Sequence, residues 1–297
     1  MKSKLNTLAL ALTLALPVPA MALTITPVNT NAAATLLAAL LAPGSGINVV
    51  AGTVQFVGNT VVGSEQSATY TGMNLVPDSG AGGTATITNP DGILLTSGHA
   101  NLPTTNTANN FSNALTKPGT GGNAALSALS GATTSDQNFI SFDFTLAAGN
   151  AVKANFVFAS DEFPTQTVTD IFGFFVDGTN YAFFPGGALV SNIPEANFQS
   201  NPVGTSHYDI EYNGLTTSLL VTGLLNSSLT THTMLIAVAD TSDSIWDSGA
   251  FIGNLMSTTS TGGGGIGDPG NGVPEPATLA LLGLGLAGLS FMRRKAA

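Results

Sequence analysis

The amino-acid sequence predicts a mainly β protein: an antiparallel β-sandwich of jelly-roll type with one packed helix near its N-terminus. Two observations support this fold class. Short apolar runs with the alternation of β-strands recur between residues 47 and 255, and turns rich in Gly, Asn and Asp separate them. Before them, a single Ala/Leu-rich stretch has the composition of a helix.

The first 22 residues have the parts of a secretory signal peptide. A basic start is followed by an unbroken apolar run from Leu8 to Leu16. Ala20 and Ala22 then give the small-x-small pattern that a signal peptidase cleaves. The alternative is an amphipathic first helix, but the apolar run has no polar face. We therefore expect residues 1–22 to be removed, which leaves Leu23 as the first mature residue.

A helix is expected over Asn29–Leu41, at the start of the mature chain. Asn29, Thr30 or Asn31 can cap its N-terminus, and Pro43 with Gly44 stops it. So apolar a segment is poorly suited to the surface, and we expect it to pack against a sheet.

Short strands account for the rest of the body. In 139–146 every second residue is apolar, including Ile140, Phe142 and Phe144, which is typical of an antiparallel strand with one buried face. Residues 171–176 are apolar on both faces and are expected to be central. The predicted strands are 47–50, 53–57, 67–70, 84–88, 93–96, 139–146, 152–158, 171–176, 181–184, 208–212, 219–222, 234–239 and 250–255.

A linker and an apolar segment end the chain. Residues 257–272 are rich in Gly, Ser and Thr and have nothing to bury. The motif after the linker consists of Val273, Pro274, Glu275 and Pro276. An apolar run follows at 277–292, shorter than the roughly 20 residues of a full membrane span. The basic tail consists of Arg293, Arg294 and Lys295 and is expected to snorkel and to stay cytoplasmic.

Residues 273–297 closely resemble the PEP-CTERM sorting signal of Gram-negative bacteria. The resemblance rests on the order of Val-Pro-Glu-Pro, apolar helix and basic tail. It implies a transmembrane helix before processing, recognition by an exosortase-type membrane transpeptidase and cleavage near the Pro-Glu-Pro. It also implies transfer to the cell surface or the extracellular matrix.

The charge of the body, residues 23–272, excludes several classes of partner. This region holds 16 of the 17 acidic residues but only Lys117 and Lys153, so 16 acids against two lysines give a formal charge of −14. Nucleic acids and anionic lipid surfaces need Lys and Arg. Cysteine is absent, so no disulfide stabilises the exported domain, and bound cations are an alternative source of stability.

Several motifs of the body together resemble the choice-of-anchor L domain. They occur in the order Asp91–Gly98, Phe158–Pro164, Asp170–Phe175, Ile236–Asp240 and Asp247–Ile252, after the apolar helix. The resemblance spans about Ala32 to Asn254 and implies an extracellular domain joined to a C-terminal sorting signal. We expect residues 23–256 to form this single domain.

Two acidic loops are the candidate site. The residues are Asp161, Glu162, Asp170, Asp240, Asp243 and Asp247. Each lies at or just after the end of a predicted buried strand, so the carboxylates converge if those strands are neighbours. Converging carboxylates need cations, and Ca²⁺ prefers hard oxygen ligands from loops. The alternative is that these residues form solvated turns. Zinc is disfavoured, because Cys is absent and the three His have no ligand spacing.

These features predict a non-enzymatic structural or binding module, exported to the cell envelope, surface or extracellular matrix. Its expected partners are the exosortase-type enzyme and, in the matrix or biofilm, exopolysaccharide or other surface proteins. The alternative is a secreted hydrolase that acts on polysaccharide or protein through a carboxylate pair. Two Asp-Ser-Gly tripeptides, at Asp78 and Asp247, leave an aspartic-protease pair open.

Overall fold

In the residues that it describes, the computed structural model contains two packed β-sheets, a separate two-stranded sheet, two α-helices and a short 3-10 helix (Glu195–Asn197). It describes residues 22–78, 82–107, 119–164, 169–193, 195–204 and 207–261. The predictions for the signal peptide up to residue 21, for most of the linker and for residues 273–297 lie outside these ranges. Within them, no helix is long and apolar enough to cross a membrane.

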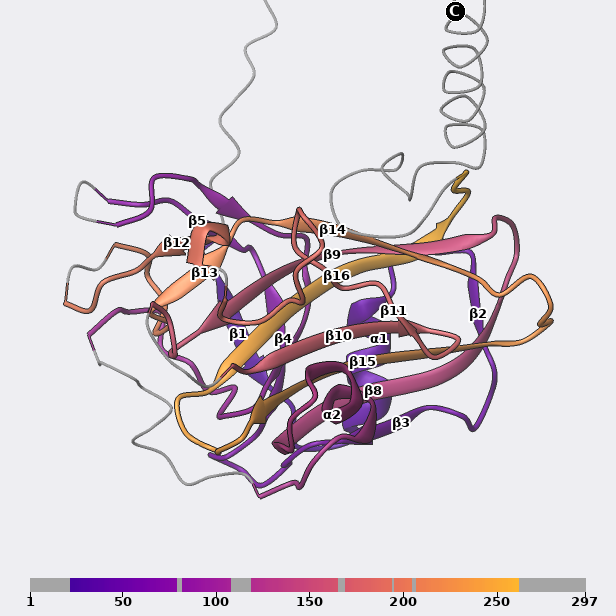
Figure 1. Ribbon diagram of the computed structural model, residues 1–297, viewed down its shortest axis with the longest axis horizontal. Helices are drawn as coiled ribbons and strands as arrows, with labels where there is room; N and C mark the ends of the chain where they lie inside the picture. The colour runs from indigo at the N-terminus through magenta and orange to yellow at the C-terminus, as the bar shows by residue number, and fades with distance from the viewer. Residues whose placement is uncertain are drawn as a thin grey trace, which may run out of the picture.

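The larger sheet has eight strands and is antiparallel throughout (Figure 1). Its order is β1 (Thr24–Pro27), β4 (Ser67–Thr71), β7 (Gly92–Thr96), β16 (Ser248–Thr258), β9 (Ala151–Ser160), β13 (Gly214–Thr216) and β12 (Phe198–Ser200), with β14 (Leu219–Leu224) also on β9.

The second sheet has six strands, also antiparallel. Its order is β11 (Thr179–Asn180), β10 (Ile171–Val176), β15 (His232–Thr241), β8 (Thr134–Leu146) and β2 (Ile47–Val49), with β3 (Gln55–Val57) also on β8. A separate pair is formed by β5 (Asn74–Leu75) and β6 (Ile87–Thr88).

The core lies between the two sheets, which makes the body a β-sandwich. Side chains such as Phe156 and Phe158 on β9 pack in one buried cluster with Phe142 and Phe144 on β8. On β8 the predicted alternation is confirmed: the even-numbered residues from 134 to 144 are buried, and the odd-numbered ones are partly exposed. The mainly β, antiparallel class is therefore confirmed, whereas the jelly-roll connectivity stays a prediction.

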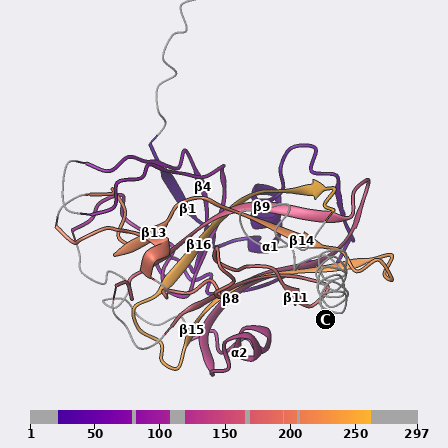
Figure 2. The same cartoon turned by 45° about the horizontal axis from the view of Figure 1, so that its top comes forward.

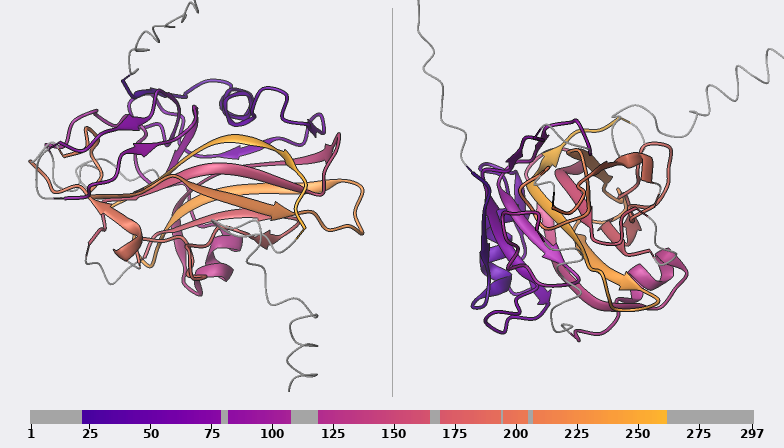
Figure 3. Two further views of the ribbon diagram at one scale, coloured as in Figure 1. Left: turned by 90° about the horizontal axis from the view of Figure 1, so that it is seen from above. Right: turned by 90° about the vertical axis from the view of Figure 1, so that its left-hand side faces the viewer.

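The helices lie on opposite sides of the molecule (Figure 3). Helix α1 (Ala32–Leu40) buries Ala32, Leu36 and Leu40 against the main core, which confirms the predicted packed helix. Asn31 occupies the N-cap position, but its side chain makes no capping hydrogen bond.

Helix α2 (Ala124–Ser130) was not predicted. It stands on the outer face of the six-stranded sheet, where Leu126 packs with Ile171 and Phe175 (Figure 2). This cover explains why β10 is apolar on both faces although it lies next to the short edge strand β11.

Two predicted strands are wrong. Residues 208–212 form no strand, and Tyr208, Ile210 and Tyr212 instead pack on the outer face of the eight-stranded sheet. The alternation of apolar and polar residues in this segment arises because one side of it is buried, and not because its backbone pairs with a strand. The predicted strand at 181–184 is also absent: the strand after the turn is limited to Thr179 and Asn180, and Phe183 forms an isolated bridge to Leu189.

Candidate functional site

Both acidic loops lie at one end of the sandwich. The end of β9 runs into Asp161 and Glu162, and Asp170 directly precedes β10. In the eight-stranded sheet Ser160 pairs with Ser248, and the amide of Asp161 donates a 3.1 Å hydrogen bond to the carbonyl oxygen of Asp247.

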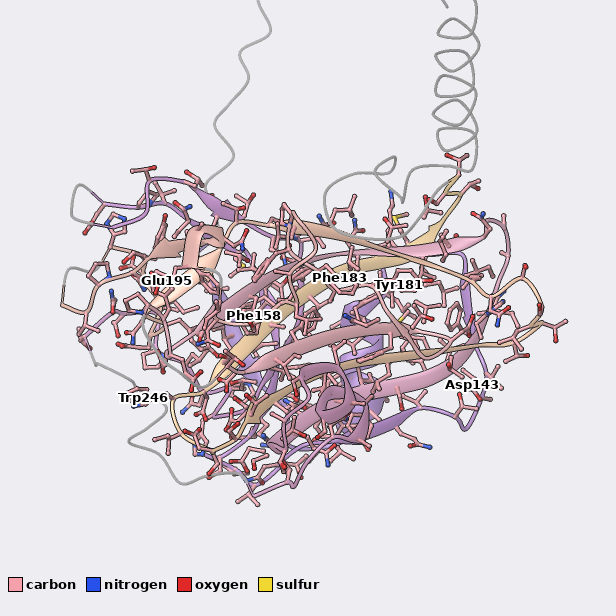
Figure 4. All side chains as sticks on the ribbon, viewed as in Figure 1. Asp143, Phe158, Tyr181, Phe183, Glu195 and Trp246 are labelled. Carbon is pink, nitrogen blue, oxygen red and sulfur yellow. The ribbon has the colours of Figure 1, made fainter. Side chains whose placement is uncertain are left out.

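The second sheet brings the other acids to the same end. Ile171 pairs with Ala239, so Asp170 and Asp240 stand at neighbouring strand ends. Two of the connections that pass from one sheet to the other, β9 to β10 and β15 to β16, occur here. The loop between β15 and β16 carries Asp243, Trp246 and Asp247 (Figure 4).

Buried serines tie the strand ends together beneath the acids. The Ser248 hydroxyl donates to Ser160 Oγ at 2.8 Å, and the Ser248 amide donates to Ser97 Oγ at 3.0 Å. The amide of Glu162 donates to Ser160 Oγ at 3.0 Å. Gly98 lies so close to Asp247 that a Cβ there would be 1.8 Å from Asp247 Oδ2. Gly98 thus leaves the space that the Asp247 carboxylate occupies.

The carboxylates at this end are withdrawn from solvent. Asp170 and Asp240 are 0 % exposed, and Glu162 is 2 % exposed. Both carboxylate oxygens of Asp170 and of Asp240, together with Glu162 Oε2, accept no hydrogen bond from the described residues. Ser248 and Ser97 lie near Asp170 and Asp240 and favour their ionised forms. The hydroxyl of Ser248, however, donates its hydrogen bond to Ser160 Oγ, and the hydroxyl of Ser97 donates to the Ser248 carbonyl oxygen.

Burial and mutual repulsion raise the pKa values of three of these acids. Burial first, and then the charges of Asp243 and Asp247, raise the pKa of Glu162 to about 8. Burial, and then the charges of Asp240, Glu162 and Asp247, hold the pKa of Asp170 well above its usual range.

The pKa of Asp240 is also raised far above its usual range, by burial first and then by the charges of Asp247, Asp136 and Glu162. Five of the six predicted residues are therefore mutual electrostatic neighbours. Asp161 lies at the same end, where its charge helps to raise the pKa of the Tyr212 hydroxyl.

Sequence reasoning missed Asp136, which joins this acidic cluster from β8. It is 3 % exposed, has φ of 48° and accepts a 2.6 Å hydrogen bond from the amide of Gly119 on Oδ1. A β-bulge lies opposite, between Val238 and Asp240. The sequence does contain a pattern that indicates this position: if the alternation of β8 is extended towards the N-terminus, Asp136 lies on the inward face.

Comparison with known proteins assigns the body to a family. A profile of the choice-of-anchor L domain matches residues 48–256. The chain belongs to the choice-of-anchor L domain family. The match contains both acidic loops and begins after α1. The resemblance of the body motifs to this family is therefore confirmed.

The C-terminus of this choice-of-anchor L protein carries a second match. A profile of the PEP-CTERM protein-sorting motif covers residues 272–295. This motif implies recognition by an exosortase, export and a location at the bacterial cell envelope or surface. No curated protein and no solved structure matches the chain significantly.

The donors at the acidic end of the choice-of-anchor L domain fit a hard cation. All are carboxylate or hydroxyl oxygens, and several of the carboxylate oxygens accept no hydrogen bond within the described part of the chain. Lys153, the one Lys or Arg among the described residues, lies about 23 Å along β9 from Ser160 at 3.3 Å per residue. Within the described ranges, no three His, Asp or Glu side chains are arranged to hold a metal ion as they stand. Binding therefore requires side-chain rotation.

Proposed function

We propose that this protein is a non-enzymatic surface module whose acidic end binds calcium. The observation that carries the proposal is the group of buried carboxylate oxygens on Asp170, Asp240 and Glu162 that accept no hydrogen bond from any residue that the structure describes. A buried polar atom without a partner costs free energy, and a buried charge costs more. A cation removes both costs at once.

Calcium suits this donor set better than other metals. Ca²⁺ takes six to eight oxygen ligands in flexible geometry, whereas Mg²⁺ demands a near-ideal octahedron. Asp170, Asp240 and Glu162 would hold the ion, and Asp136, Asp161, Asp243 and Asp247 surround them as further oxygen donors. When bound, calcium supplies positive charge that offsets the repulsion among these acids. It would also link β9, β10, β15 and the loop into β16.

The proposed role follows from the sorting motif and the buried site together. An exported domain without disulfides gains rigidity if calcium joins its strand ends. After processing by an exosortase-type enzyme of a Gram-negative cell, the module would stay in the envelope or matrix. Exopolysaccharide or other surface proteins are its proposed partners there.

The burial of the acids disfavours the hydrolase alternative. A general acid and a nucleophile must reach the bond that is cleaved, but Asp170 and Asp240 are fully buried. Asp78 of the other Asp-Ser-Gly tripeptide lies 3.1 Å from His207 Nδ1 and is half-exposed. Robust hydrolysis of a polysaccharide or protein by the purified body, abolished by Asp247→Ala, would overturn the non-enzymatic role.

Sorting is tested in cells with the motif altered. Replacing Pro274 and Glu275 by Ala together is expected to leave an unprocessed form in the inner-membrane fraction, because the transpeptidase no longer recognises its substrate. Immunoblots of inner-membrane, outer-envelope and medium fractions measure this. The matched control is Asp268→Ala in the adjacent linker, which should be processed normally. Normal delivery of the Pro274/Glu275 variant would contradict exosortase processing.

A further inference from the structure

A groove of about 660 Å³ opens on the outer face of the six-stranded sheet, beside α2. Its lining comes from β8, β15, β3, the turn before β3 and the start of α2, and includes Thr53, Gln55, Phe139, Ser141, Asp143 and Thr233. Asp143 and Trp246 lie towards opposite ends of the molecule in Figure 4, so the groove is separate from the acidic end.

The strand register explains the groove. The odd-numbered residues of β8 face outward, and α2 covers this face only over β10 and the adjoining parts of β15 and β8. In the uncovered part, Gln55 pairs with Ser141, and Asp143 pairs with Thr233. Paired residues are about 4.8 Å apart across strands, and alternate residues about 6.6 Å apart along one strand. The floor therefore combines these polar side chains with the partly exposed Leu235, which pairs with Ser141.

The polar side chains of the groove floor have hydrogen-bonding groups that a ligand can use. The side-chain polar atoms of Gln55, Ser141, Asp143 and Thr233 make no hydrogen bond to any residue that the structure describes. Nearby, Asn123 and Gln137 are already engaged, since Asn123 Nδ2 donates to Gln137 Oε1 at 3.2 Å. The groove thus offers an amide, a carboxylate and two hydroxyls, with the partly exposed ring of Phe139 alongside.

This combination matches a sugar better than other ligands. Planar amide and carboxylate groups can bind adjacent hydroxyls of a pyranose, and an aromatic ring packs against its apolar C–H face. The single carboxylate and the body's formal charge of −14 disfavour an anionic polymer. Among the described lining residues, Asp143 is the one acid, which is too few to bind a cationic peptide tightly.

We infer that this groove binds a segment of a neutral polysaccharide through Gln55, Ser141, Asp143 and Thr233. The inference rests on the proposed function as a surface or matrix module, and it names the site and the ligand class. An open groove on a sheet face suits a chain that passes over it, rather than a small molecule enclosed on all sides.

The test is isothermal titration calorimetry of the calcium-loaded body, residues 23–272, with neutral hexasaccharides of glucose, mannose and N-acetylglucosamine. At least one series should bind, and Asp143→Ala and Gln55→Ala should each weaken binding about 10-fold or more, as expected for lost hydrogen bonds to sugar hydroxyls. Thr145→Ala is the matched control, because Thr145 faces outward on the same strand beyond the groove. It should leave binding unchanged.

Three results would overturn the inference: no hexasaccharide binds, binding is the same in Asp143→Ala and Gln55→Ala, or only an oligolysine peptide or an anionic uronic-acid oligomer binds. The melting temperature of each variant, measured with calcium, shows whether it is folded. Loss of sugar binding with an unchanged calcium-dependent melt separates failure of the groove from failure of the calcium site. Envelope fractionation tests sorting independently.

Discussion

Asp170→Asn is expected to stabilise the metal-free protein and to remove most of its response to calcium. Asp170 is fully buried, neither of its carboxylate oxygens accepts a hydrogen bond from the residues described, and Asp240, Glu162 and Asp247 repel its charge. An amide of the same shape removes that repulsion. The expected gain in the free energy of unfolding is on the order of 1–4 kcal/mol, by analogy with buried ion pairs that are replaced by uncharged residues of similar volume.

The opposite effect is expected with calcium present. An Asn offers one weaker oxygen ligand in place of a carboxylate, so the ion binds less tightly and stabilises the folded state less. At saturating calcium the variant should therefore melt below the unaltered protein, and with chelator it should melt above it. Asp240→Asn should behave in the same way. The measurement is thermal unfolding by circular dichroism, in which 1 kcal/mol shifts the melting temperature by roughly 2–4 °C for a domain of this size.

A matched control separates this change from general charge removal. Asp209 is exposed and outside the acidic cluster, so Asp209→Asn should leave both melting temperatures nearly unchanged. If Asp170→Asn lowered the melting temperature equally with calcium and with chelator, Asp170 would be a structural residue and not a cation ligand.

The metal-free protein is also expected to lose stability as pH rises from about 5 to above 8. The pKa of Glu162 is raised from 4.5 to about 8, so the folded state holds a proton that the unfolded chain releases in this interval. Stability from such a group is complete below the unfolded pKa and is lost as pH rises through the folded pKa. Asp170 and Asp240, whose pKa values are also raised, act in the same direction.

The size of the pH effect follows from linkage. The rise in the pKa of Glu162 from 4.5 to about 8 corresponds to at most about 5 kcal/mol, and screening by water or ions reduces this value. Below pH 4 the free energy of unfolding of the metal-free protein should instead decrease as pH falls. The pKa of Asp177 is lowered by hydrogen bonds from the Asn226 and Thr233 amides and from His232, against the opposing effect of burial. Its stabilisation is therefore lost as pH falls through its folded pKa.

Urea unfolding at pH 5, 6, 7 and 8 with chelator measures the trend. Glu162→Gln should flatten it, because the amide does not titrate, whereas Asp209→Asn should keep the slope of the unaltered protein. Stability that rose steadily from pH 5 to pH 8 in the chelated protein would show that these acids are ionised in the folded state without a cation.

Local pattern was enough to predict the central strands. The alternation in β8 and the apolar run of β10 each reflect burial on specific faces, which is the physical cause of the pattern. It was not enough for α2, whose seven residues are mostly Ala and Ser. Its signals were Asn123, which caps the first turn, and Gly131 with φ of 71° at its end. Nor could alternation tell the buried segment 208–212 from a paired strand.

The acidic end was predictable only in part, because chain order places acids at strand ends but does not pair the strands. That Asp170 lies beside Asp240 depends on the pairing of β10 with β15, a contact between segments far apart in sequence. Asp136 required knowledge that β8 begins five residues earlier than its apolar alternation indicated. Among the described residues, no group donates a hydrogen bond to the carboxylate oxygens of Asp170 and Asp240. This follows from the packing around them, which a local sequence pattern does not predict.

The central claim, that the acidic end binds calcium, is tested most directly by one measurement. The purified body, residues 23–272, is melted at pH 8 with 1 mM calcium, with excess chelator and with 1 mM magnesium, and its bound metal is determined by elemental analysis. We expect about one calcium per chain or more, and a melting temperature that is several degrees higher with calcium than with chelator or magnesium. Identical melting temperatures in calcium and chelator, with no bound metal, would contradict the claim.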